Sequence, residues 1–156
     1  MKPQDTITKM QKNLPGSAAG RQRQHAAFEH LLAAFAASSA EPPAQRWHYL
    51  EAAHVLGQNR FTLHWRAHWH MLRYARQLGD AFETRGQWAR LALTVVGHVV
   101  RRLPQGNTGR AIVPALQSMV PSAPVRERIA QAMAAVAPHS AEALAQRQAP
   151  PPARQG

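Results

Sequence analysis

Apolar residues recur at three- and four-residue intervals through most of the middle of the chain, which is the period of an amphipathic α-helix. The first such stretch holds two interleaved rows at this spacing: Ala27, Leu31 and Ala34, and Phe28, Leu32 and Phe35. Together with the prolines and glycines that interrupt it, the pattern predicts helices over residues 17–38, 43–57, 61–78, 80–102 and 123–136.

The residues between these segments are typical helix boundaries. Pro43 suits the first turn of the second helix, where its missing N–H is not needed. Gly57 is a favourable terminator, because a residue without Cβ adopts the left-handed backbone conformation freely. The third helix closes at Gly79, and Asp80 is a good N-cap for the fourth.

One segment, residues 94–100, allows a competing interpretation. It is rich in β-branched residues, which favour strands: Thr94, Val95, Val96, Val99 and Val100. The flanking sequence is helix-like and no partner strand is evident, so we predict a helix here.

The expected fold is all-α, an antiparallel helical-hairpin bundle of four to five helices joined by short links. The turns at 56–57 and 78–80 look loosely like those of tetratricopeptide helical pairs, although the full repeat signature is absent. We expect a single helical domain over 17–136. A flexible segment, 1–16, precedes it and a disordered Pro/Ala/Gln-rich tail, 137–156, follows, because neither end shows apolar periodicity.

The composition excludes several kinds of site and partner. The chain has no cysteine, which excludes disulfides, thiolate ligands and thiol nucleophiles. Its net charge of +11 comes from dispersed basic residues without a nucleic-acid-binding motif, so we do not expect nucleic acid as the main partner. There is no apolar signal region at the N-terminus, and the apolar stretch 91–100 is shorter than the roughly 20 residues that span a bilayer. We expect a cytoplasmic protein without membrane insertion.

Two histidines lie on the apolar side of the third predicted helix. At about 100° of rotation per residue, His64 and His68 share that side, one turn apart. The rest of it is formed by apolar residues: Phe61, Trp65, Met71, Leu72 and Ala75. An i, i+4 pair of imidazoles on one face can bind a single metal ion.

The second predicted helix has a matching feature, since Glu51 and His54 share a face with apolar residues. If the two helices form a hairpin with these faces opposed, four side chains meet: Glu51, His54, His64 and His68. Three imidazoles and a carboxylate suit zinc, copper(II), nickel or iron. A di-iron centre would need more carboxylates. We therefore predict a divalent transition-metal site of these four residues, used in metal handling or sensing without catalysis.

The same residues also allow a purely structural interpretation. A core histidine often donates to a backbone carbonyl, and Glu51 can pair with an arginine, since buried carboxylates need a partner. The cluster would then be a polar network inside a helical module that binds an unknown protein partner. The tryptophans, Trp47, Trp65, Trp69 and Trp88, are expected to pack the hairpins, with Trp69 partly exposed.

Other residues have possible supporting roles. Glu83, Gln87 and His98 share a face of the fourth helix and are placed to orient an imidazole or to pair locally. The Gly-Asn-Thr-Gly segment 106–109, followed by Arg110, has the glycines of an anion-binding loop. It lacks the lysine of a phosphate loop, so we interpret it as a plain turn. No nucleophile motif is present, which favours a protein that is not an enzyme.

The segments around this cluster also resemble a known family. Residues 50–58 (Leu-Glu-Ala-Ala-His-Val-Leu-Gly-Gln) and 64–72 (His-Trp-Arg-Ala-His-Trp-His-Met-Leu), followed by Gly86-Gln87 and the loop 106–109, are similar to the bacterial family catalogued as domain of unknown function 3703. The resemblance covers roughly residues 45–120 and implies a small helical protein without an established activity. All four predicted ligands match the family pattern. Ala52 and Arg110 depart from it, standing where arginine and glycine are usual.

Overall fold

The apolar periodicity forms helices throughout the described part of the chain. The computed structural model describes residues 18–99 and 105–137, and all regular structure within them is α-helical. The helices are α2 (Ala18–Ala37), α3 (Pro43–Gly57), α4 (Phe61–Gln77), α5 (Ala81–Val99) and α6 (Ala123–Ala135). The predicted all-α class is confirmed, and the β-branched segment is helical as far as Val99; its predicted continuation to residue 102 lies outside the described residues.

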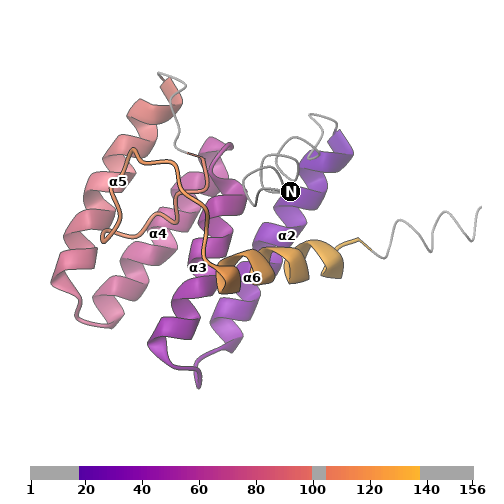
Figure 1. Cartoon of the computed structure of the whole chain (residues 1–156), viewed down its shortest axis with the longest axis horizontal. Helices are drawn as coiled ribbons and strands as arrows, with labels where there is room; N and C mark the ends of the chain where they lie inside the picture. The colour runs from indigo at the N-terminus through magenta and orange to yellow at the C-terminus, as the bar shows by residue number, and fades with distance from the viewer. Residues whose placement is uncertain (1–17, 100–104, 138–156) are drawn as a thin grey trace, which may run out of the picture.

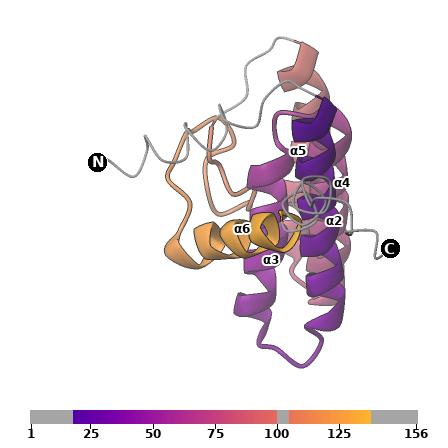
Figure 2. The same cartoon turned by 90° about the vertical axis from the view of Figure 1, so that its right-hand side faces the viewer.

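Helices α2 to α5 lie side by side in chain order, each antiparallel to the one before it (Figure 1). Figure 2 shows α6 running across this array, and its contacts are with α2 and α3. The described part of the connection between α5 and α6, residues 105–122, lies over α3, α4 and α5 (Figure 1). The antiparallel helical-hairpin bundle is therefore confirmed, whereas a tetratricopeptide likeness is not.

Helix α3 is the most enclosed element, because α2, α4 and α6 all pack against it. Every residue from 49 to 57 is buried, whichever way its side chain points. An ordinary amphipathic helix keeps one face in water. The polar side chains of this segment, Tyr49, Glu51 and His54, must therefore find partners within the protein.

The turn between α3 and α4 depends on Gly57 for a different reason from the one predicted. Gly57 is not among the glycines with positive φ, so the left-handed terminator was the wrong interpretation. A Cβ at this position would lie 2.8 Å from Cβ of Leu63 and 3.2 Å from the ring of Phe28. Glycine is required because α2, α3 and the start of α4 approach closely there.

The turn between α4 and α5 does use a left-handed glycine. Gly79 has φ of +70°, and the N–H of Asp80 donates to the carbonyl of Ala75, which closes the C-terminus of α4. The Asp80 carboxylate then accepts from the N–H of Glu83 at 2.8 Å. The predicted N-cap is confirmed, and the two helices are joined by a short, hydrogen-bonded turn.

The tryptophans are less buried than predicted. Trp47 is 5% exposed and packs in the core, but Trp65, Trp69 and Trp88 are 37%, 44% and 54% exposed. The prediction that they pack the hairpins thus holds for Trp47, and the partial exposure of Trp69 is confirmed.

Some predictions concern residues outside 18–99 and 105–137. The flexible segment 1–16 lies outside the described residues, as does the tail 137–156 apart from residue 137, so the proposed domain limits stay predictions. None of the described helices combines the length and apolarity needed to cross a bilayer.

Candidate metal centre

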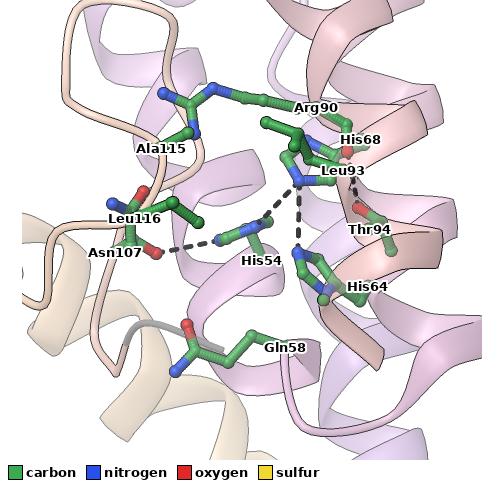
Figure 3. A pocket seen from close by; sticks show the side chains of 11 residues that line it. His54, Gln58, His64, His68, Arg90, Leu93, Thr94, Asn107, Ala115 and Leu116 are labelled. Atoms are coloured by element: carbon green, nitrogen blue, oxygen red, sulfur yellow. Dashed lines mark hydrogen bonds between the residues drawn. The ribbon is translucent and has the colours of Figure 1, made fainter. Parts of the chain in front are cut away.

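Three histidines from two helices lie together beneath the α5–α6 connection (Figure 3). His54 comes from α3, and His64 and His68 come from successive turns of α4. All three are buried, with 3%, 6% and 2% of their surface exposed. Their position follows from local geometry, because i, i+4 residues share a helix face and the short turn folds α3 against that face.

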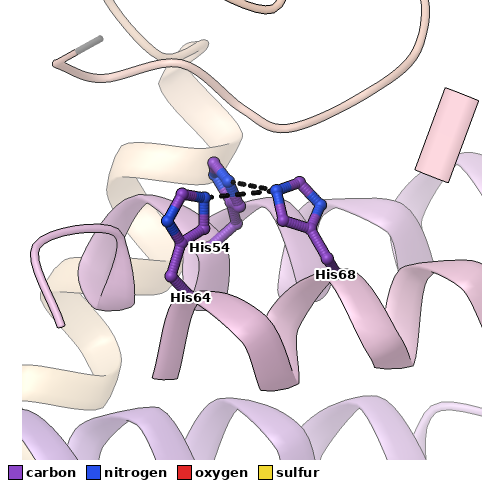
Figure 4. Close-up of side chains that lie close together, drawn as sticks. All are labelled: His54, His64 and His68. Atoms are coloured by element: carbon purple, nitrogen blue, oxygen red, sulfur yellow. Dashed lines mark hydrogen bonds between the residues drawn. The ribbon is translucent and has the colours of Figure 1, made fainter. Parts of the chain in front are cut away.

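The three Nε2 atoms point towards one another (Figure 4). Nε2 of His68 lies 3.1 Å from Nε2 of His54 and 3.2 Å from Nε2 of His64. One ligand nitrogen from each ring falls within 4.8 Å of the others. A tetrahedral ion bound at 2.0–2.1 Å would separate its nitrogen ligands by about 3.3 Å. The two separations measured from Nε2 of His68 match that value closely, and the third pair of ligand nitrogens lies within 4.8 Å.

The hydrogen-bond partners of two rings define which nitrogens carry protons. Nδ1 of His54 lies 2.9 Å from the carbonyl oxygen of Asn107, which can only accept, so this nitrogen is an N–H donor. Nδ1 of His68 lies 2.8 Å from Oε1 of Gln87. The orientation of that amide is fixed, because its Nε2 donates to Oε1 of Glu83 and to the carbonyl of Gly109. Both imidazoles therefore present an unprotonated Nε2.

Burial keeps the three rings neutral. Desolvation, followed by the charges of neighbouring imidazoles, lowers the pKa of His64 to about 3 and that of His54 well below its usual range. Desolvation also lowers the pKa of His68 to about 4, against the hydrogen bond to Gln87. The Arg90 charge contributes in the same direction at all three histidines. Each ring is a neutral imidazole at pH 7, the form that binds metals.

His64 differs from the other two because its Nδ1 is buried with no hydrogen-bond partner among the described residues. The ring of His98, on α5, lies 5.2 Å from that of His64, centroid to centroid. Nδ1 of His98 donates to the carbonyl of Thr94 at 2.9 Å. Its Nε2 is then an acceptor, and it too is buried without a partner in the described part of the chain. Two complementary nitrogens thus lie on adjacent rings.

The structure does not bring the fourth predicted ligand, Glu51, to the three imidazoles. Its carboxylate binds Nη1 of Arg110 at 3.2 Å, and the guanidinium also binds Glu83 at 3.0 Å and lies 3.8 Å from the ring centre of Trp47. Burial raises the pKa of the Glu51 carboxyl, and the Arg110 charge opposes that rise. Sequence reasoning named an arginine as one possible partner, but the residue that supplies it lies 59 positions away in the chain.

The loop at 106–109, interpreted from sequence as a plain turn, covers the histidines. Gly109 has φ of +80°, and a Cβ there would lie within 2.8–2.9 Å of atoms in the His54 ring. The Asn107 side chain braces the loop, donating to the carbonyls of Pro114 and Gln117 and accepting from the N–H of Gly109. The glycines and Asn107 therefore allow a backbone carbonyl to reach the imidazole of His54. Sequence reasoning missed this role, for which the Gly-Asn-Thr-Gly pattern was the available signal.

The face of α5 that carries Glu83 and Gln87 orients an imidazole, which is one of the two roles expected from the sequence. Gln87 orients His68, and Glu83 holds Gln87 at 2.7 Å and the N–H of Ala111 at 2.9 Å. A chain of contacts therefore runs from the α5–α6 connection through Glu83 and Gln87 to a ring of the cluster. Such outer partners fix the tautomer and direction of a metal-ligating histidine.

A small cavity of about 40 Å³ adjoins the three imidazoles (Figure 3). Polar groups at its wall include Arg90, Thr94 and Gln58, and apolar groups include Leu93 and Leu116. A water molecule needs about 10–15 Å³ measured in this way, so the cavity has room for a few non-hydrogen atoms beside the Nε2 cluster.

Comparison with known proteins supports the family resemblance. A family model described as "Protein of unknown function (DUF3703)" matches residues 21–133, which include the three histidines and the loop over them. No curated protein and no solved structure matches the chain. Because the family match spans most of the sequence, the chain belongs to the DUF3703 family.

Proposed function

We propose that this protein binds one divalent transition-metal ion through Nε2 of His54, His64 and His68, in metal handling or sensing. The observation that carries the proposal is the 3.1 Å separation of two Nε2 atoms, on His54 and His68, that both lack a proton. Two lone pairs at that distance repel each other unless a cation lies between them.

A purely structural polar network accounts for this contact less well. If Nε2 of His64 carried a proton, it would donate a hydrogen bond to Nε2 of His68 at 3.2 Å. The contact between Nε2 of His54 and Nε2 of His68 would still lack a proton. Protonating a ring is opposed by burial and by the nearby Arg90 charge. A metal ion satisfies all three lone pairs at once.

The donor set indicates the class of metal. Three neutral imidazoles suit zinc, copper(II), nickel or iron(II), and are poor ligands for magnesium and calcium, which prefer oxygen. Glu51 is not part of the proposed ligand set, because Arg110 holds its carboxylate. The protein supplies three ligands, which leaves a further coordination position.

Metal analysis tests the proposal. Tag-free protein, loaded with zinc and freed of excess ion by desalting, should retain about one ion per chain, and a His64→Ala/His68→Ala double variant should retain none. The matched control is His30→Ala/His70→Ala, which removes two histidines from outside the cluster, one exposed and one half-buried. Equal zinc retention by the two double variants would contradict the proposal.

A further inference from the structure

The charges around the histidine cluster balance before any metal is added. Arg110 holds the carboxylates of Glu51 and Glu83, and Arg90 is a second guanidinium, whose charge interacts with that of Glu83. Two negative and two positive charges therefore surround three neutral imidazoles. A divalent ion bound there would add two uncompensated positive charges to a buried site, which is costly without an anion nearby.

Arg90 is placed to attract that anion. It is 7% exposed, and its charge is close enough to act on all three imidazoles. Its Nη2 donates to the carbonyls of Arg110, at 2.6 Å, and Val113. Both bonds use Nη2. Within the described residues Nε and Nη1 of Arg90 make no hydrogen bond, so they are available to a ligand. A guanidinium is planar and presents its N–H groups as a fork that suits oxyanions.

The cavity connects Arg90 with the Nε2 cluster and limits the size of what enters. Arg90, His54, His64 and His68 all line the same space of about 40 Å³. Leu93 and Leu116, also at its wall, are 41% and 75% exposed, so the space adjoins the protein surface. A ligand of three or four non-hydrogen atoms fits such a volume, whereas an aromatic carboxylate is too large to be enclosed in it.

Building on the proposed metal site, we infer that the site binds a small monovalent oxyanion of the formate or bicarbonate class, with one oxygen on the metal and another on the Arg90 guanidinium. The anion fills the coordination position that the three histidines leave open and removes part of the buried positive charge. The site thus recognises a metal and a small anion together.

Cobalt(II) provides the test, since its visible absorption depends on the ligands. Full-length protein loaded with cobalt should change its spectrum in a saturable way when formate, bicarbonate or azide is added, and benzoate should have no effect. In Arg90→Gln, the affinity for formate should fall at least about tenfold, because a hydrogen bond to a charged group is lost. Cobalt affinity should stay the same or rise, because a repelling positive charge is removed.

Controls separate the possible failures. Arg85→Gln removes an exposed arginine of the same helix and should leave formate affinity unchanged. Arg90→Lys keeps the charge without the fork and should bind formate with intermediate affinity. If cobalt does not bind the wild-type chain, the proposed function itself fails. If cobalt binds but no anion alters its spectrum, or if Arg90→Gln loses cobalt and formate affinity in proportion, the anion site is overturned and the metal site stands.

Discussion

Gly109 lies against the face of His54, so closely that a single methyl group on its Cα would come within 2.8–2.9 Å of the ring. Gly109→Ala should therefore lower the free energy of unfolding by at least about 1–3 kcal/mol, the usual cost of a left-handed non-glycine residue. It should also weaken zinc binding, because the ring of His54 must move. Chemical denaturation and zinc titration measure the two effects.

Gly79→Ala is the matched control for this change. Gly79 has nearly the same backbone conformation, with φ of +70°, but nothing lies within 4 Å of its Cβ position. The Gly79→Ala variant should lose stability and retain its zinc affinity. If both alanine variants keep full zinc affinity, the contact between Gly109 and His54 does not position a ligand.

Glu51→Gln distinguishes the proposed three-histidine site from the four-residue site expected from sequence. Glutamine still offers Arg110 an oxygen acceptor, so the fold should be kept, and the zinc affinity should stay within about twofold to threefold of wild type. Calorimetric titration measures it. A drop of tenfold or more would mean that the carboxylate binds the metal after all.

His98 is expected to accept a hydrogen bond from Nδ1 of His64 when the metal is bound, since both nitrogens are buried without partners among the described residues. His98→Ala should lower zinc affinity about 10–100-fold, as is typical when the partner of a ligating histidine is lost. His25→Ala, on an exposed part of α2, serves as the control. Unchanged affinity in His98→Ala would exclude this orienting role.

Acid should destabilise the metal-free protein in a defined window. The pKa values of His64 and His68 are about 3 and 4 in the folded state and about 6.5 when exposed, so the unfolded state binds more protons between these limits. Stability should therefore fall as the pH drops from about 6.5 towards 4, by up to about 1.4 kcal/mol per pH unit for each histidine.

Denaturant titrations of the metal-free chain across this range check the prediction. The His64→Ala/His68→Ala variant should show a shallower decline, because two of the groups responsible are gone. An equally steep decline in that variant would assign the acid sensitivity to other groups.

The helices and the three imidazoles could be predicted from sequence because both depend on local geometry. Helical pitch alone places His64 and His68 on one face, and a short turn folds His54 towards them. The face of α5 that carries Gln87 was identified by the same reasoning.

The remaining parts of the site depend on contacts between distant segments. The Glu51 carboxylate binds Arg110 and is not grouped with the three imidazoles, and Arg110 reaches it because the α5–α6 connection lies against α3. No periodicity in the sequence indicates where that loop lies. The same holds for Asn107, whose carbonyl meets His54 from 53 residues away.

X-ray absorption spectroscopy of the zinc-loaded protein observes the proposed coordination by His54, His64 and His68 itself. We expect three imidazole nitrogens at about 2.0–2.1 Å, with the outer-ring scattering of histidine, and one further light ligand. A first coordination shell with fewer than three imidazoles, or one dominated by carboxylate oxygens, would contradict it.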